Sequence, residues 1–241
     1  MPRGLQIGVS TPPRVTTLAV ESDGSIYWDF TADTPNQTYG VSNARPLARE
    51  SWDVLGNRTT LAASTWPLEY TPQGAVIGRR VRGLFKDSTD DFGCYDDVRW
   101  DDLTWLNATE GTFLAWFTPL KSSGVFQRII ELSDGTPANR IGLLRHGTDC
   151  VLRAETSSSQ VVRLTQGNLL ANQFAKVAFS YKANEWELYV FNEGEIKATA
   201  SGAVPTVTQG HIGGLRGIAS DSEMGGIKYW TTADILGNVL T

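Results

Sequence analysis

The segment Lys176-Val177-Ala178-Phe179-Ser180-Tyr181 decides the fold, because every second side chain from Val177 to Tyr181 is large and apolar. Successive side chains of a β-strand point to opposite faces, so this alternation predicts a strand with one buried face. The alternation resumes from Trp186 to Val190, after the turn Lys182-Ala183-Asn184. The two segments therefore predict an antiparallel hairpin that buries the same face on both strands.

The same pattern recurs through the second half of the chain, between short turns rich in Gly, Asn, Asp and Ser. A turn of helix is expected only after Thr232, with Thr232 as its cap and Gly237 at its end. The fold class predicted is all-β, an antiparallel β-sandwich. The predicted strands are 112–117, 128–132, 140–145, 151–155, 161–164, 176–181, 185–191, 196–200, 211–213 and 226–230.

The first 72 residues have a different character. Asp23-Gly24 predicts a tight turn between strands at 15–20 and 25–30, but between residues 31 and 72 prolines interrupt the chain and the apolar periodicity fades. We therefore expect residues 1–72 to form an extended N-terminal arm with a small β-hairpin. Residues 73–241 are expected to form the sandwich domain, most clearly from residue 111.

Composition excludes several partners. The net charge is −5, and the densest basic segment is only Arg79-Arg80-Val81-Arg82, so no nucleic acid partner is expected. No apolar run approaches the roughly 20 residues of a membrane span. The start, Met1 to Gln6, lacks the apolar stretch of a secretory signal, so synthesis in the cytoplasm is expected. A single disulfide between Cys94 and Cys150 is left open.

No catalytic residues are predicted. A glycosidase on a β-sandwich needs two nearby carboxyl groups, and the closest candidates, Glu185 with Glu187 and Glu193 with Glu195, flank a hairpin turn without the Glu-x-Asp-x-Glu layout. The only histidines, His146 and His211, lie outside any nucleophile motif and are expected to be structural. The chain is therefore predicted not to be an enzyme.

Four segments in order, 111–117, 175–181, 187–192 and 227–230, resemble the laminin-G or concanavalin A-like jelly roll, in which an opening strand, a central hairpin and a closing aromatic strand recur. A second stretch is similar to the lead-in of bacteriophage virion proteins that end in such a jelly roll. It comprises Tyr70-Thr71-Pro72-Gln73-Gly74-Ala75-Val76-Ile77-Gly78, then Ser88-Thr89-Asp90-Asp91-Phe92 and Trp100; Arg79-Arg80-Val81-Arg82 departs from that family's pattern and leaves the subfamily open.

This resemblance implies a virion structural protein, a tail fibre, head fibre or decoration component that displays a lectin-like sandwich able to bind host-surface carbohydrate. Its partners would be other virion proteins and copies of itself, with a trimer most in keeping with fibres, and its location would be the virion after synthesis in the host cytoplasm. Two alternatives stay open: a polysaccharide-degrading glycoside hydrolase on the same fold, and a cellular carbohydrate-binding adhesion module.

The resemblance also implies that loop oxygens can hold calcium, as laminin-G-like domains do, although solvated turn residues are an equally physical explanation of such loops. Asp134 with Asn139 forms one candidate calcium loop, and Asp101 with Asp102 another. Trp100, beside the second loop, is the best candidate for stacking on a sugar, whereas Trp116, Trp186 and Trp230 are expected in the core. The candidate ligand-binding residues are thus Trp100, Asp96, Asp97, Asp134 and Asn139.

Overall fold

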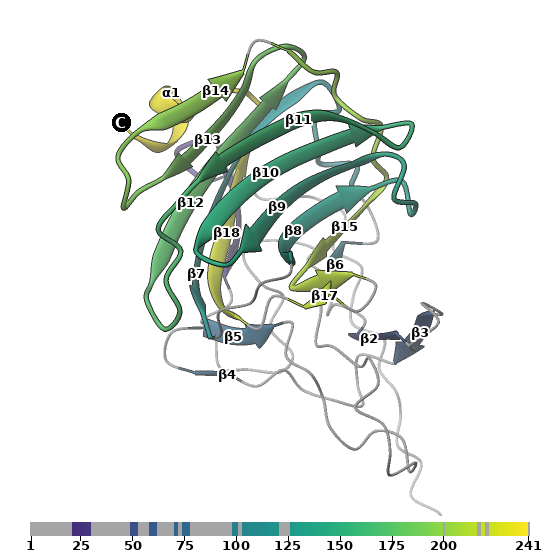
Figure 1. Cartoon of the computed structure of the whole chain (residues 1–241), viewed down its shortest axis with the longest axis vertical. Helices are drawn as coiled ribbons and strands as arrows, with labels where there is room; N and C mark the ends of the chain where they lie inside the picture. Colours follow the sequence, from purple (N-terminus) through teal and green to yellow (C-terminus); the bar gives the residue numbers. More distant parts are fainter. Residues whose placement is uncertain are drawn as a thin grey trace, which may run out of the picture.

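The computed structural model describes residues 21–29, 98–100, 103–120, 126–199, 201–215, 218–219 and 222–240, together with short strands at 49–52, 58–61, 70–71 and 74–77. These residues form two antiparallel sheets that face each other as a sandwich (Figure 1). The all-β class predicted from the sequence is confirmed.

One layer is an eight-stranded sheet in the order β14-β13-β12-β7-β18-β5-β4, with β1 paired to the same edge of β18 as β5. Its strands are β1 (Ile26–Asp29), β4 (Tyr70–Thr71), β5 (Gly74–Ile77), β7 (Glu110–Pro119), β12 (Ala175–Lys182), β13 (Trp186–Val190), β14 (Ile196–Thr199) and β18 (Ser222–Trp230).

The second layer is a six-stranded sheet in the order β11-β10-β9-β8-β15-β6, and β2-β3 and β16-β17 form two separate two-stranded sheets. All ten strands expected from the alternation are present, with ends that differ by a few residues. The strands of these sheets are β2 (Arg49–Trp52), β3 (Arg58–Leu61), β6 (Val98–Trp100), β8 (Gln127–Ser133), β9 (Arg140–His146), β10 (Asp149–Thr156), β11 (Ser159–Gln166), β15 (Gln209–Ile212), β16 (Gly214–Leu215) and β17 (Ile218–Ala219).

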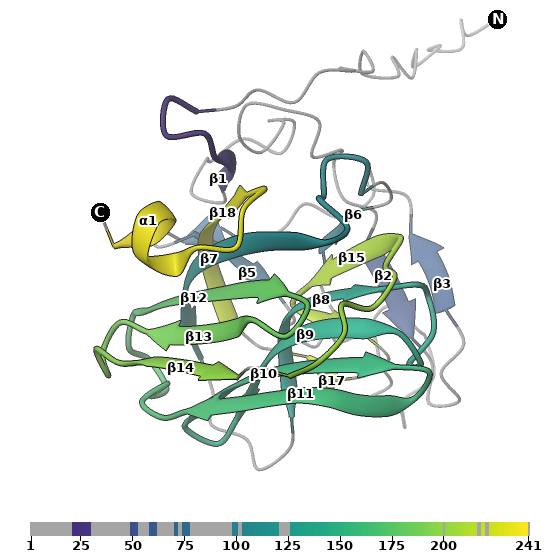
Figure 2. The ribbon, with the colours of Figure 1, turned by 90° about the horizontal axis from the view of Figure 1, so that it is seen from above.

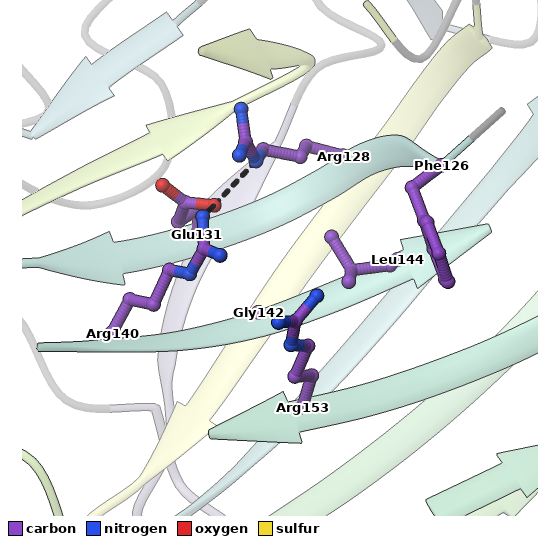
Figure 3. A pocket seen from close by; sticks show the side chains of 7 residues that line it. All are labelled: Phe126, Arg128, Glu131, Arg140, Gly142, Leu144 and Arg153. Carbon is purple, nitrogen blue, oxygen red and sulfur yellow. Dashed lines mark ion pairs between the residues drawn. The ribbon is translucent and has the colours of Figure 1, made fainter. Parts of the chain in front are cut away.

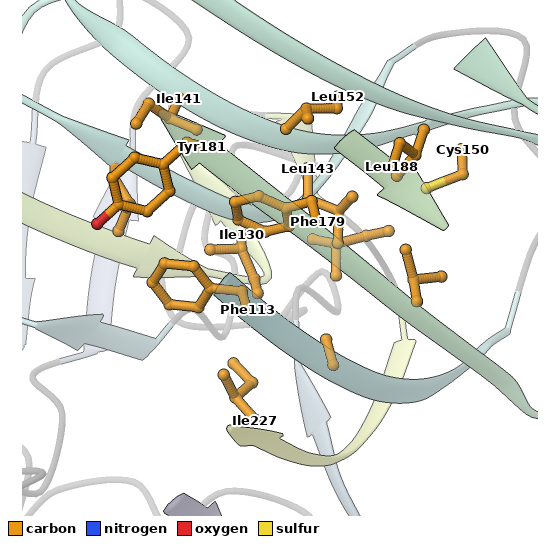
Figure 4. Packing of buried hydrophobic residues seen from close by; sticks show 14 of the residues in the cluster. Phe113, Ile130, Ile141, Leu143, Cys150, Leu152, Phe179, Tyr181, Leu188 and Ile227 are labelled. Carbon is orange, nitrogen blue, oxygen red and sulfur yellow. The ribbon is translucent and has the colours of Figure 1, made fainter. Parts of the chain in front are cut away.

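The core lies between the layers, where both sheets turn their apolar side chains inward (Figure 4). Phe113 and Phe179 stack across β7 and β12 with ring centroids 5.0 Å apart, an arrangement that adds to the stabilisation from burial alone. Cys150 is buried in this core as a free thiol, while Cys94 lies outside the described residues. Burial raises the pKa of the Cys150 thiol, so it is an inert core group.

Of the three tryptophans expected in the core, Trp186 is buried between the two layers, whereas Trp230 is buried on the outer face of the eight-stranded sheet, in a second cluster with Leu114. Trp116 is not fully buried. It is half-buried on the outer face of the eight-stranded sheet and stacks on Tyr27, with ring centroids 5.6 Å apart. Its neighbours on β7, Ala115 and Phe117, face the core, so alternation along the strand points Trp116 outward.

The predicted turn at Asp23-Gly24 is confirmed, with Gly24 at φ 77° and its amide donating to the Glu21 carbonyl. The strand that leaves this turn, β1, pairs with β18; residues 15–20 lie outside the described residues. Strands β1 and β4, both within the first 72 residues, thus belong to the eight-stranded sheet. The segment expected to be an arm therefore contributes directly to the sandwich.

The helix α1 (Ile235–Val239) lies against the outer face of the eight-stranded sheet (Figure 2), where Ile235 packs on Leu114 and Trp230. Its cap is Asp234, not Thr232 as expected, since Asp234 Oδ1 accepts from the Gly237 amide at 2.8 Å. Gly237 therefore lies inside the helix and does not end it. Among the described residues, no helix is long and apolar enough to cross a membrane.

Candidate ligand-binding site

A row of residues crosses the outer face of the six-stranded sheet. Strand pairing places His211, Glu131, Gly142, Arg153 and Arg163 opposite one another on β15, β8, β9, β10 and β11. Their neighbours along each strand belong to the core, so this row points away from it. Gly142, in the middle of this row, has no side chain, so a gap remains between Glu131 and Arg153.

This gap is part of a hollow of ≈ 180 Å³. A Cβ at Gly142 would meet first the Leu144 side chain, at 3.4 Å, and the backbone of Gly142 is not in the left-handed region. Neither crowding nor a special turn explains a glycine here, although glycine weakens a strand interior and often marks a close approach of a ligand. The lining residues are Phe126, Arg128, Glu131, Arg140, Gly142, Leu144 and Arg153 (Figure 3).

Charged side chains fix one wall of the hollow. Arg128 Nε lies 2.5 Å from Glu131 Oε2, and Arg140 bridges two acids, with Nε 2.6 Å from Glu155 Oε2 and Nη1 3.9 Å from Glu131 Oε2. Arg153 completes the series as a second partner of Glu155. Burial opposes the charged form of Arg140, but the bond to Glu155 and the two negative charges outweigh it and raise its pKa. The result is a ladder of alternating charges, arginine at both ends.

Two polar atoms of the lining residues are left over. Glu131 Oε1 and Arg153 Nε are buried without a hydrogen-bond partner, and the Glu131 side chain is only 2% exposed. A buried polar group without a partner costs about 1–3 kcal/mol. Glu131 Oε1 can accept hydrogen bonds and Arg153 Nε can donate one. A molecule rich in hydroxyl groups can therefore bond to both atoms.

An aromatic ring closes the opposite side. Phe126 lies next to His146, with ring centroids 4.7 Å apart, and the Arg163 guanidinium lies 5.7 Å from the centroid of its ring. Figure 3 shows Phe126 and Leu144 together at this side, away from Glu131 and Arg140. The hollow is therefore polar on one side and apolar on the other, as a pocket for an amphipathic ring requires.

Trp100, expected to contact a ligand, is a core residue instead: it is 4% exposed and packs edge-on against Trp105, at 5.5 Å between centroids. A Cβ at Gly210, opposite Trp100 on β15, would come within 2.5 Å of its ring. The ring thus fills the space that glycine leaves. The remaining acidic candidates beside it, Asp96, Asp97, Asp101 and Asp102, lie outside the described residues.

Asp134 and Asn139 do come together, but as a closed turn between β8 and β9. Asp134 Oδ1 accepts from the amide and hydroxyl of Thr136, at 2.8 and 2.6 Å, and its Oδ2 accepts from Asn139 Nδ2 at 2.7 Å. Asn139 Oδ1 accepts from the Ser157 amide at 3.1 Å. Within the described part of the chain, no three His, Cys, Asp or Glu residues are grouped as metal ligands would be.

The residues of the hollow were not identified from the sequence. A signal was present: Gly142 interrupts a predicted strand, and a glycine inside a strand marks a bulge or a close approach. Charged residues at outward positions on three successive strands, among them Glu131 and Arg153, were the second signal. Only the register of β8, β9 and β10 shows that these positions meet.

No protein-family model and no curated protein sequence matches the chain. Among solved structures, the chain is similar to the Trypanosoma rangeli sialidase (TM-score 0.54, 14% identity, 95% of this chain and 34% of that one). It is also similar to the Bacillus licheniformis β-glucanase (TM-score 0.53, 17% identity, 87% and 99%). The fold is a concanavalin A-like jelly roll.

A third similar structure is the NanB sialidase of Streptococcus pneumoniae, with a TM-score of 0.46 and 14% identity over 54% of this chain. The present chain spans 23% of that protein and 37% of the mouse laminin α1 LG4-5 structure. The two structures with TM-scores above 0.5, the Trypanosoma rangeli sialidase and the Bacillus licheniformis β-glucanase, show the jelly-roll fold and, at 14% and 17% identity, the fold alone.

Proposed function

We propose that this chain is a carbohydrate-binding protein that holds a sugar in the hollow above Gly142. The observation that carries the proposal is the open glycine between Glu131 and Arg153, each of which keeps one buried polar atom without a partner. A sugar offers hydroxyl groups that both donate and accept, together with an apolar ring face suited to Phe126.

Binding without hydrolysis fits the chemistry of the hollow better than catalysis. Arginine side chains hold Glu131 and Glu155 in ion pairs, whereas a glycosidase uses two carboxyl groups that act on the substrate, one as acid and the other as base or nucleophile. Of the earlier candidates, Glu187 accepts from Ser180 Oγ at 3.0 Å on the other sheet. We therefore propose that the chain is not an enzyme.

We further propose that this module is part of a bacteriophage virion, as a fibre or decoration component made in the host cytoplasm. The similarity of residues 70–78 and the following segment to virion proteins supports this. Strands β1, β4 and β5 add early segments of the chain to the sheet opposite the hollow. Attachment at that sheet would present the hollow to a host-surface glycan. Assembly with other virion proteins and with copies of itself, three in our working hypothesis, completes the proposal.

A glycan array tests the binding proposal. We expect the purified chain to bind a subset of an array that pairs sialylated, uronic-acid and sulfated oligosaccharides with their neutral parents. Gly142→Leu should fill the hollow and abolish binding, and Gly142→Ala should weaken it. Ala198→Leu introduces the same side chain at an exposed strand position on the other sheet, so this matched control should bind normally. Circular dichroism checks that all variants are folded.

Three outcomes would contradict the proposal. Binding that survives Gly142→Leu would place the sugar elsewhere, and no binding to any glycan would reject a carbohydrate ligand. Release of shortened oligosaccharides would favour the hydrolase alternative. Separately, peptide mass spectrometry of purified particles should find the chain in the virion, and light scattering should find an oligomer. A stable monomer recovered only from the cell surface would favour the adhesion module.

A further inference from the structure

The two sides of the glycine differ in charge. On the β8 side, the carboxylate of Glu131 lies between Arg128 and Arg140 and is neutralised by them. On the other side, Arg153 and Arg163 lie directly opposite each other on β10 and β11. Like charges at directly opposed positions of an antiparallel pair repel each other. The hollow is therefore positive at one end.

Nearby acids do not fully neutralise this positive end. Among the described residues, Arg153 pairs with Glu155 alone, and it shares that carboxylate with Arg140. Arg163 is exposed and, within the described part of the chain, contacts the ring of Phe126 and forms no ion pair. An anion between the two guanidinium groups would relieve their repulsion and could accept from both, as guanidinium groups commonly bind carboxylate or sulfate.

The end of the hollow at Glu131 can accept a hydrogen bond from a ligand. Glu131 keeps Oε1 without a partner, and a carboxylate can only accept hydrogen bonds. Strands β8 and β10 are two steps apart in the sheet, so their backbones are separated by about 10 Å. One substituted sugar ring can extend over that distance, above the glycine that separates the two residues.

From this polarity, and resting on the proposed function, we infer that the preferred ligand is an acidic sugar. Its carboxylate or sulfate group binds Arg153 and Arg163, and its hydroxyl groups donate to Glu131. Gly142 provides the space for the ring between them. The orientation is fixed by charge, since the reverse would place an anion against Glu131.

The decisive variant is Arg163→Gln, because Arg163 lies on the exposed edge strand β11 and its loss should leave the fold intact. We expect the chain to bind acidic members of the array at least tenfold more tightly than their neutral parents. The probes are oligogalacturonate with its carboxyl-reduced form, sialyllactose with lactose, and sulfated galactan oligosaccharides with their desulfated forms. Arg163→Gln should remove most of this preference, by weakening binding of the acidic probes far more than binding of their neutral parents.

Lys197→Gln is the matched control, since it removes one positive charge from β14 on the other sheet, and it should change neither affinity. Raising the salt concentration should weaken binding of the acidic probes selectively. The three probe pairs distinguish a carboxylate ligand from a sulfated one. Equal affinity for acidic and neutral forms, or a preference that survives Arg163→Gln, would overturn this inference while the proposed function stands. Failure of every glycan to bind would overturn both.

Discussion

The β8–β9 hairpin carries two polar clusters that use their hydrogen-bonding groups differently. At the turn, Asp134 and Asn139 satisfy each other and the adjacent backbone. On the sheet face of the same hairpin, Glu131 and Arg140 belong to a charge ladder that leaves buried atoms without partners. Polar residues close in sequence can close a turn among themselves. Polar residues on several strands are held in place by the sheet and cannot all bond to one another. Some of their hydrogen-bonding atoms therefore remain available to a ligand.

The largest effect is expected from Arg140→Ala. This change leaves Glu155 and Glu131, whose side chains are only 5% and 2% exposed, without the guanidinium they share. Removing the only partner of a buried charge costs about 3 kcal/mol or more. Glu131 keeps Arg128 and Glu155 keeps Arg153, so urea denaturation should show a loss of about 2–3 kcal/mol in the free energy of unfolding. The double variant Arg140→Met, Glu155→Leu should recover most of it. An Arg140→Ala variant as stable as the parent would mean that the ladder does not hold this face.

A smaller effect is expected at the turn. Asn139→Ala removes the donor to Asp134 and the acceptor of the Ser157 amide, and the loss of these bonds should cost about 1–2 kcal/mol in urea denaturation. Binding of glycans should not change, because the turn lies outside the hollow. Should Asn139→Ala abolish binding in the array while the protein remains folded, the turn would be part of the site and the contrast between the two clusters would be wrong.

The contrast between the turn and the sheet face also explains which features could be predicted from the sequence. Alternating large side chains, as from Val177 to Tyr181, predict strands because burial of one face is a local property of the chain. An antiparallel sandwich and its ten main strands could therefore be predicted, while the jelly-roll arrangement was implied by the resemblance of four segments to that fold. The hollow could not, because it depends on which residues of different strands stand opposite one another. A shift of one residue would turn Glu131 or Arg153 to the other face.

The expectations for Trp100 and Asp134 were limited in the same way. Trp100 was assigned to a ligand because acidic residues surround it in the sequence, whereas its position is set by pairing of β6 with β15, where Gly210 makes room for the ring. Asp134 was a calcium candidate because laminin-G-like domains, which the chain resembles, can hold calcium with the oxygen atoms of loops. The sequence shows that such atoms are near one another, but it does not show that Thr136 and Asn139 already occupy them.

The pH dependence of stability tests whether the hydrogen bonds at the turn stabilise the Asp134 carboxylate. Burial opposes ionisation of Asp134, but hydrogen bonds from Thr136 and Asn139 outweigh it and hold its pKa below the ordinary 3.8. A folded-state pKa below the unfolded value gives stability that is fully present above about pH 4 and is lost as the pH falls through the folded pKa. The free energy of unfolding should therefore fall less between pH 5 and pH 3 in Asp134→Asn than in the parent. Equal losses in both proteins would show that the turn carboxylate is not stabilised by folding.

The smallest change in stability is expected on addition of calcium. A folded-state site with a dissociation constant of about 0.1 mM would add roughly 1.4 kcal/mol at 1 mM calcium, or about 3–5 °C in the melting temperature of a protein of this size. Because the oxygens of Asp134 and Asn139 are already used, we expect a shift below about 1 °C. A larger shift that disappears in Asp134→Ala would show that the turn opens to bind the ion, so that bonding within a cluster does not exclude a ligand. A larger shift that persists in that variant would instead assign calcium to Asp101 and Asp102.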